Sequence, residues 1–494
     1  MLPRRRFLLG TTALPWLAAG CARTTVERTS TVVNDVHSRL NATRVAGVAT
    51  PRAAADLPAV VRQARRDGRA ISVAGGRHAM GGQQFGEDTL LVDTRALQRV
   101  IGFDADRGRV EVECGIQWPE LIAELRRRQA DRRRQWGIVQ KQTGADRLTI
   151  GGAVAANIHG RGLTLKPFVG DLESFTLVDA TGEPRRCSRT ENAELFRLAA
   201  GGYGLFGIVA TAVLRLAPRR KLERVVEIID MDGLSDAFER RIEQGFLFGD
   251  CQYATDATSA DFLRRGVFSC YRPVDDARAM PPEQKELAAA DWDRLLYLSH
   301  TDKRRAFETY AAYYVSTSGQ LYWSDTTQLS VYLDDYHAAL DRRLGASEPA
   351  TEIITEIYVP RASLAAFLGD VRADFRRHRT DLIYGTVRLI ERDDETMLAW
   401  AREPWACIIF NLHTVHNGDG LAQAADAFRR LIDLAIARGG SYFLTYHRFP
   451  TRRQVEACYP QFAEFLRRKR QHDPEERFQS EWYRHYRRMF ANVL

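Results

Sequence analysis

Hydrophobic positions in the first half of the chain recur with the spacings of alternating helices and strands. Apolar residues at positions 57, 60, 61 and 64 predict a helix within 51–68, ending at Gly68. A second helix is predicted over 118–128, because Pro119 suits a first helical turn. Short apolar or alternating runs predict strands over 71–74, 89–93, 108–115, 175–179 and 212–216. The pattern indicates an α+β domain.

The second half has fewer glycine-rich loops and longer elements. Strands are predicted over 225–229, 351–360, 382–390 and 406–413, and helices over 234–244, 364–378 and 421–438. Aromatic side chains are dense between residues 310 and 336. We expect an antiparallel sheet covered by helices on one side.

Composition narrows the class of protein without identifying a partner. The 494 residues are 45% hydrophobic and 27% charged, which excludes collagen-like, coiled-coil and disordered chains. This length predicts at least two domains. The net charge of +8 is mild, and no basic motif interleaved with aromatic residues is present, so we expect no nucleic-acid partner. The densest basic runs, 126–134 and 467–470, are typical of solvated helix faces or of contacts with anionic lipid.

The first 21 residues have the pattern of an export address. Three arginines precede an uncharged apolar run over 8–19 that is too short to span a bilayer. The arginines before Phe7 resemble a twin-arginine signal; a basic end on a buried helix is the alternative. Residues 17–21 resemble a lipoprotein cleavage box, implying a lipidated Cys21, with simple cleavage as the alternative. We expect an exported protein, periplasmic or tethered to the outer membrane face, in which 22–45 is a linker.

Three glycine-rich stretches carry the first candidate chemistry. They cover residues 74–82, 143–160 and 201–209, and each lies near a predicted strand or helix. Glycines let backbone N–H groups approach an anionic ligand, and the small residues of the second stretch leave room for a large flat one. Neither a Walker loop nor a GxGxxG fingerprint is present.

In their order and spacing, these stretches and the strand Phe175-Thr-Leu-Val-Asp resemble the PCMH-type FAD-binding module of the vanillyl-alcohol oxidase family. The resemblance covers 46–219 and implies two small α+β subdomains that hold FAD. It further implies a substrate domain over 220–450 and a C-terminal segment, 451–494, that returns to the FAD domain. Carried over to this chain, it places FAD against Ala74, Gly75, Gly76, Arg77, His78, Ala79, Met80, Gly81, Gly82, Gly144, Thr149, Ile150, Gly151, Gly152, Ala156, Asn157, Ile158, His159 and Ile208.

The histidine of the first glycine loop has a specific meaning within that resemblance. Several members of the family attach the flavin ring covalently at this position, which implies a bond through His78; a merely polar loop residue is the alternative. A second anchor in some members is a cysteine shortly before the second glycine pair. Ala145 and Asp146 stand there, so we expect no second covalent bond.

The second half resembles, more loosely, the substrate domain of sugar-oxidising members of the family. That resemblance implies catalytic roles for Glu356 and Arg388, which would orient substrate hydroxyls. It also points to the neighbours Tyr446 and His447, of which one faces the flavin if the segment is a strand. His447 is the more natural base near neutral pH, whereas Tyr446 needs a lowered pKa. The alternative for each of these four residues is a position on the surface, or one in the core whose polar atoms are hydrogen-bonded within the protein.

Together these features predict an FAD-dependent oxidoreductase that oxidises a CH–OH group of a sugar, polyol, lactone or sugar-lipid. Electrons would pass to O₂ or to a quinone or cytochrome. The alternatives are a flavin-dependent C=C reductase of the same fold and a non-enzymatic membrane-anchored binding lipoprotein. The seven cysteines have no metal-ligand spacing, so no metal is expected and most are predicted to be buried thiols.

Overall fold

The computed structural model describes residues 25–27, 29–330 and 336–494, and the predicted export signal with Cys21 lies outside them. Near the N-terminus, four strands form a sheet in the order β1-β4-β6-β5. The strands β4 and β5 both pair with β6 in parallel, so the helix between them crosses over the sheet. These elements are β1 (Thr25–Glu27), β4 (Gly47–Thr50), α1 (Leu57–Arg66), β5 (Ile71–Ala74) and β6 (Leu90–Asp93), and a separate two-stranded sheet joins β2 (Thr31–Val33) to β3 (Thr43–Val45).

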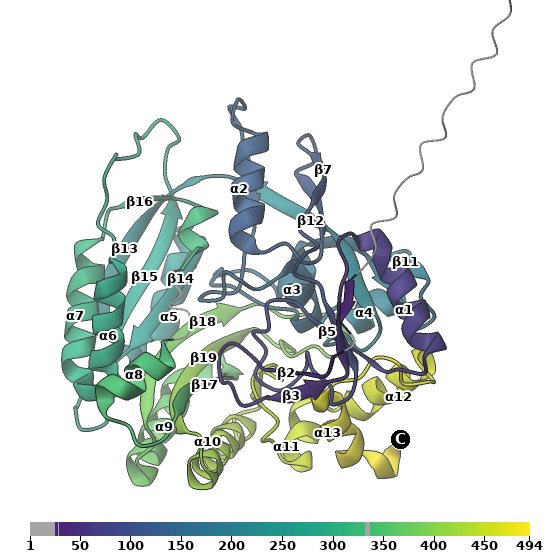
Figure 1. The fold of residues 1–494 in the computed structure, drawn as a ribbon. Helices are drawn as coiled ribbons and strands as arrows, with labels where there is room; N and C mark the ends of the chain where they lie inside the picture. The colour runs from purple at the N-terminus through teal and green to yellow at the C-terminus, as the bar shows by residue number, and fades with distance from the viewer. Residues whose placement is uncertain (1–24, 28, 331–335) are drawn as a thin grey trace, which may run out of the picture.

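A second, antiparallel sheet follows in the order β11-β10-β12-β8-β7, and β9 pairs with one end of β12. The helix α2 projects from it, and α3 and α4 lie against it (Figure 1). Its elements are β7 (Val100–Asp104), β8 (Arg109–Glu113), α2 (Trp118–Arg128), β9 (Trp136–Ile138), α3 (Ile150–Ala156), β10 (Leu172–Val178), β11 (Pro184–Ser188), α4 (Ala193–Ala199) and β12 (Ile208–Pro218).

The third sheet is antiparallel, with eight strands in the order β16-β13-β15-β14-β18-β19-β17-β20. Its strands are β13 (Lys221–Asp230), β14 (Phe248–Tyr253), β15 (Arg265–Pro273), β16 (Leu321–Trp323), β17 (Ala350–Pro360), β18 (Leu382–Ile390), β19 (Trp405–Val415) and β20 (Ser441–Tyr442). The helices around it are α5 (Leu234–Glu243), α6 (Ala289–Thr301), α7 (Lys303–Ser316), α8 (His337–Leu344), α9 (Leu364–His378) and α10 (Gly418–Ile436). The α+β class with a second, sheet-containing region is confirmed.

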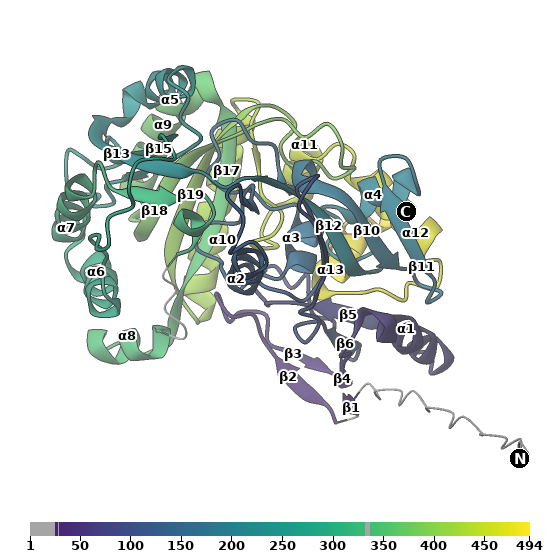
Figure 2. The ribbon, with the colours of Figure 1, turned by 90° about the horizontal axis from the view of Figure 1, so that it is seen from above.

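Helices cover both faces of this sheet, so the expectation of helices on one side is wrong. Phe268 of β15 packs edge-on against Phe238 of α5, whereas its neighbour Val267 packs with Tyr310 of α7. Successive strand residues point to opposite faces, so α5 and α7 lie on opposite sides. Figure 2 shows α5 and α9 on one side of the sheet and α6 and α7 on another. The helix α7 was not predicted from the sequence, because its aromatic residues face both a cavity and the core and do not form a single apolar stripe.

The C-terminal helices are α11 (Arg452–Cys458), α12 (Phe462–His472) and α13 (Glu481–Met489). Of these, α11 lies against α10, and α12 and α13 lie near the first sheet (Figure 1). The Ile71 amide donates to the Arg477 carbonyl at 2.6 Å, and the Gln479 amide donates to the Ile71 carbonyl at 2.8 Å. The tail thus adds a short extended segment to the outer edge of β5.

The six cysteines of the described residues are all buried, and none is paired. This confirms their expected role as buried thiols. None of the helices in the described part of the chain has the length and apolar character needed to cross a bilayer.

Candidate functional site

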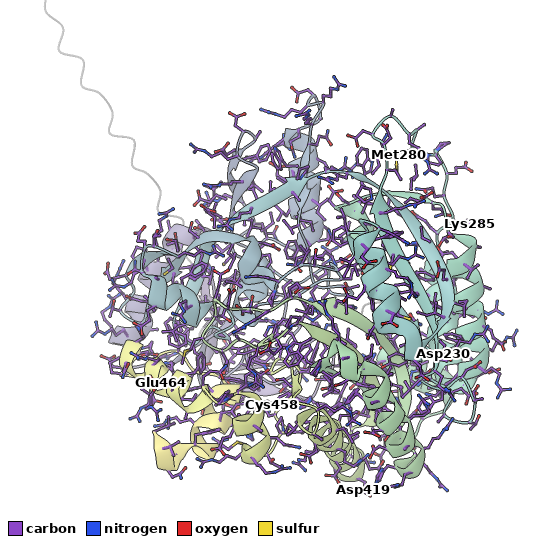
Figure 3. The ribbon with its side chains drawn as sticks, turned by 180° about the vertical axis from the view of Figure 1, so that it is seen from behind. Asp230, Met280, Lys285, Asp419, Cys458 and Glu464 are labelled. Atoms are coloured by element: carbon purple, nitrogen blue, oxygen red, sulfur yellow. The ribbon has the colours of Figure 1, made fainter. Side chains whose placement is uncertain are left out.

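A cavity of about 820 Å³ lies between the glycine-rich stretches and one face of the eight-stranded sheet. Its first wall comes from residues 75–80, 142–145, α3 and 204–209. Its second wall comes from β14, β17, β18 and β19 and from the aromatic residues of α6, α7 and β16. Figure 3 labels Met280 and Lys285 in the loop between β15 and α6, and both line the same cavity.

The loop after β5 presents its backbone to the cavity. A Cβ on Gly76 would lie 2.2 Å from the carbonyl oxygen of Arg147, so the loop is pressed against the segment before α3. Within the described residues, no hydrogen bond uses the amide N–H groups of Gly76, Arg77 or Ala79. Unused N–H groups on a loop of this kind are a site for phosphate. Arg77 adds a positive charge and is held by Asp93 at 3.0 Å.

His78 lies in the cavity wall beside a second histidine. Its Nδ1 is 2.8 Å from Nε2 of His37, and the rings are tilted with centroids 4.8 Å apart. Burial keeps the pKa of His78 well below its usual value and lowers that of His37 to about 4. Both imidazoles are therefore neutral at neutral pH, the form in which nitrogen is nucleophilic.

Not every residue implied by the resemblance reaches the cavity. The lining includes Gly75, Gly76, Arg77, His78, Ala79, Met80, Gly144, Gly151, Gly152, Ala156, Ile158 and Ile208. The following residues do not line it but lie behind it: Ala74, Gly81, Gly82, Thr149, Ile150, Asn157 and His159.

Two of the residues behind the wall hold its shape. Thr149 caps α3 by accepting a hydrogen bond from the Gly152 amide at 3.2 Å. Asn157 ends α3 in a left-handed conformation, φ 47°, and its side chain donates to Asp393 at 2.9 Å. These residues position the backbone rather than touch a ligand.

The sheet presents an alternating row of polar side chains to the cavity. Glu356 and Ile354 of β17, Asn411 of β19 and Arg388 of β18 all line it. The register sets Ile354 opposite Asn411 and Glu356 opposite Ile409, so neighbouring strands present one common face.

Glu356 is the centre of the hydrogen-bond network on this face. Its Oε1 accepts from the Tyr446 hydroxyl at 2.6 Å, and its Oε2 accepts from Tyr358 at 3.0 Å and lies 2.7 Å from Nε2 of His159. Burial alone would raise the pKa of Glu356, but His159, Arg388 and Tyr446 lower it to about 2. The group is a fully buried carboxylate at neutral pH.

Tyr446 and His447 are neighbours in the chain, but only Tyr446 reaches the cavity. Tyr446 lines the cavity, and burial together with the Glu356 charge raises its pKa well above 10. His447 lies outside the lining, stacked on Phe428 with centroids 4.4 Å apart and 3.1 Å from the Thr355 hydroxyl. Burial lowers its pKa to about 3, so it is a neutral core residue at pH 7. The structure thus brings Tyr446, Glu356 and Arg388 to the cavity, but not His447.

The predicted strand that would carry this pair is shorter than expected. The strand β20 covers only Ser441–Tyr442. Beyond it the backbone turns to the glycine loop instead: the Thr445 carbonyl accepts from the Met80 amide at 3.1 Å, and Leu444 accepts from the Gln83 side chain at 2.9 Å. These hydrogen bonds join the two walls at one edge of the cavity.

The sequence allows Arg161, just after His159, to face either the substrate or the solvent; it lines the cavity, 3.5 Å from Asp250, and donates to the Thr327 carbonyl at 2.6 Å. Other cavity residues were not predicted from the sequence. Arg224 packs on the rings of Tyr271, Tyr314 and Tyr322. Nothing in the sequence around Arg224 indicates a binding site, because only the folding of the chain brings its strand to the cavity.

The cavity also holds polar atoms that the chain does not satisfy. Within the described residues, the buried Nε and Nη1 of Arg388, Oδ1 of Asn411, and Oε1 of Gln84 and Gln142 have no hydrogen-bond partner. Buried polar groups without partners are costly, so they indicate a polar ligand. With the unused loop amides and the flat wall of Ala156 and Ile158, these groups fit a dinucleotide with a planar ring.

Comparison with known proteins identifies that ligand. Residues 45–188 match the FAD binding domain family. Over 174 residues the chain is 27% identical to L-gulonolactone oxidase of Bos taurus, which covers 35% of this chain and 38% of that protein. Over 162 residues it is 28% identical to decaprenylphosphoryl-beta-D-ribose oxidase of Mycolicibacterium smegmatis, covering 32% of this chain and 34% of that protein. The chain therefore spans less than two fifths of the length of these relatives.

Another match extends over most of the chain. The chain is 22% identical over 456 residues to cytokinin dehydrogenase 4 of Oryza sativa subsp. japonica, covering 87% of this chain and 84% of that protein. The predictions of a PCMH-type FAD-binding domain and of FAD as the cofactor are confirmed.

Proposed function

We propose that this chain, built on an FAD-binding domain, is an oxidoreductase that oxidises a CH–OH group of a sugar, polyol, lactone or sugar-lipid. The observation that carries this proposal is the buried Glu356–Tyr446 pair, which faces the cofactor wall across one cavity beside an arginine with unsatisfied N–H groups. The relatives named as an L-gulonolactone oxidase and a decaprenylphosphoryl-ribose oxidase support this substrate class.

The cofactor would be held mainly by backbone. The loop amides of Gly76, Arg77 and Ala79 would bind the pyrophosphate, and α3 with Ile158 would lie under the ring. FAD, when bound, supplies the redox chemistry by accepting a hydride from the substrate carbon.

The residues of the sheet face would handle the proton. Tyr446 stays protonated because its pKa is high, so it acts as a relay: its oxygen accepts the substrate hydroxyl proton as its own proton passes to Glu356 Oε1. His159 holds the other carboxylate oxygen in place. Arg388 would orient the hydroxyl oxygen and stabilise the negative charge that develops on it.

The direct test is anaerobic mixing of the purified flavoprotein with a panel of polyols, aldonolactones and aldoses. Bleaching of the flavin absorbance by at least one member is expected. Failure of the whole panel, with bleaching by a chemical reductant followed by reoxidation on adding an activated alkene, would favour the C=C reductase alternative.

We further propose that FAD is attached covalently through His78, whose neutral ring faces the cavity beside His37. Acid precipitation should then leave the yellow colour with the protein pellet. His78→Ala is expected to release it into the supernatant, and release from the unmodified chain would rule out the bond.

The electron acceptor and the location are also proposals. We propose O₂ or a membrane quinone or cytochrome as acceptor, and export by the twin-arginine signal with a lipid tether at Cys21. Hydrogen peroxide release compared with dye reduction distinguishes the acceptors, and membrane fractionation of Cys21→Ala tests the tether.

A further inference from the structure

A second cluster of polar side chains lies on the cavity face of the eight-stranded sheet, away from Glu356. Glu352 precedes Glu356 by four residues in β17, so both point to the same face about 13 Å apart along the strand. The register sets Glu352 directly opposite His413 of β19. His300, from the last turn of α6, closes the cluster from above.

Three ligand atoms of this cluster converge on one point. Nε2 of His300 lies 3.1 Å and Nδ1 of His413 lies 3.6 Å from the same oxygen, Oε1 of Glu352. All three atoms lie within 4.8 Å of one another. The two imidazole rings are nearly perpendicular, at 84°.

The second carboxylate oxygen is engaged separately. Oε2 accepts a hydrogen bond from the Tyr336 hydroxyl and lies 3.0 Å from Nδ1 of His337. Oε1 is therefore left to face the two histidines. A carboxylate held through one oxygen while the other binds a ligand is a common arrangement around metal ions.

The two contacts to Oε1 are attractive, but neither has the geometry of a good hydrogen bond. Within the described part of the chain, Nε2 of His300 and Nδ1 of His413 are buried and have no hydrogen-bond partner of good geometry. The side chains of His300 and Glu352 are only 4% and 3% exposed and that of His413 is 22% exposed, but both nitrogen atoms themselves are buried away from water. Atoms bound to one metal at 2.0–2.2 Å would be about 3.4 Å apart in a tetrahedral site, close to the two separations here.

We propose that His300, Glu352 and His413 bind a divalent first-row transition metal of the Zn²⁺ class. Two imidazoles and one carboxylate suit such an ion, and water would complete the site. The metal would join α6 to the two neighbouring strands β17 and β19. Because Glu352 and His337 also line a second cavity of about 300 Å³ beside the first, the metal would fix a wall of the substrate region rather than take part at Glu356.

The proposal is tested on the untagged holoprotein. After dialysis against a chelator, Zn²⁺ titration should show one site per chain by calorimetry, and Zn²⁺ should raise the melting temperature. Co²⁺ should give ligand-field bands at wavelengths beyond the flavin absorption. No binding of either ion above that of a buffer control would overturn the proposal and leave the cluster as an imidazolium–carboxylate network.

Substitutions test whether His300 and His413 are the metal ligands. His300→Ala and His413→Ala should each weaken Zn²⁺ binding by more than about 100-fold, since losing an outer partner alone costs up to that factor. The matched control is His378→Ala, which removes a histidine 3.2 Å from the Asp374 carboxylate with no third ligand. Unchanged Zn²⁺ affinity in folded His300→Ala and His413→Ala would overturn the assignment. If neither variant folds, the Co²⁺ bands of the unmodified chain decide, because imidazole and carboxylate ligation has a distinct spectrum from hydrated Co²⁺.

Discussion

At the scale of single residues, one buried carboxylate organises the proposed chemistry. Glu356 has a donor on each side, and only one of the two tyrosine donors, Tyr446, borders the cavity. Tyr358 donates to the other oxygen from outside the cavity. Removing each hydroxyl in turn therefore distinguishes the effect of a lost hydrogen bond to the carboxylate from the effect of lost proton transfer.

Replacing Tyr446 by Phe should lower kcat by about 10²- to 10⁴-fold, because a relay of this kind contributes that much to proton transfer. Tyr358→Phe removes a hydroxyl from the same carboxylate outside the cavity and should cost far less. Steady-state rates with the best substrate of the panel measure both. Equal losses in the two variants would show that the effect comes from the carboxylate alone.

His447 should make the protein less stable in acid. Its pKa is about 3 in the folded chain and near 6.5 when unfolded, so between these values the unfolded chain binds a proton that the folded chain does not. Stability is therefore lost as the pH falls below 6.5. His447→Phe keeps the stacking on Phe428 and should reduce the loss between pH 7.5 and pH 5 by about 2 kcal/mol. Urea unfolding at both pH values measures it, with His378→Ala as an exposed control that should leave the loss unchanged.

At the scale of elements, regular segments were predictable from the sequence and irregular ones were not. The helices over 118–128 and 364–378 and the strand over 382–390 agree with the structure residue for residue. The two helices each have one apolar face and the strand is a short apolar run buried on both faces, and such patterns are visible in the sequence. The segment around Tyr446 was not predictable, because its backbone bonds with the distant residues Met80 and Gln83.

The same distinction applies to the site. Glycine-rich loops are visible in one sequence, so the cofactor wall could be predicted. The second wall of the cavity, formed mainly by the eight-stranded sheet, could be predicted only in part. The predicted residues Glu356, Arg388 and Tyr446 line it. It is also lined by residues from separate elements that share no local sequence pattern: Arg161, Arg224 and Asn411. The contacts among His300, Glu352 and His413 likewise exist only in the folded chain.

The glycine loop makes a prediction at this scale. Gly76→Ala places a Cβ about 2 Å from a backbone carbonyl that cannot move freely, which should cost about 1–3 kcal/mol and reduce FAD content. Gly170→Ala is the control, since its Cβ would make an ordinary 3.5 Å contact with Lys166. The ratio of flavin to protein absorbance measures the result, and full occupancy of Gly76→Ala would contradict a tightly packed loop.

At the scale of the whole molecule, the C-terminal helices stabilise the cofactor wall. Trp482 of α13 is fully buried against Tyr203, with ring centroids 4.9 Å apart, and Tyr203 lines the cavity. Phe462 of α12 packs on the same indole at 5.7 Å. The end of the chain is thus part of the core beside the cofactor.

Trp482→Ala should destabilise the protein by about 3–5 kcal/mol through the cavity that it leaves. Because FAD stabilises only the folded chain, the flavin-loaded variant should melt at a higher temperature than the flavin-free variant. Thermal unfolding with and without FAD measures both effects. Arg488→Ala, an exposed change on the same helix, should do neither.

The contact of residues 477–479 with Ile71 has a consequence for how the protein is made. One edge of the first sheet is completed by a segment that is synthesised long after Ile71. At ordinary translation speeds, roughly 20 to 80 s pass between the synthesis of Ile71 and that of residues 477–479. Until then the nascent chain has an uncovered strand and an unfinished cofactor pocket. We therefore expect stable FAD binding only after this segment has been made, rather than earlier in elongation.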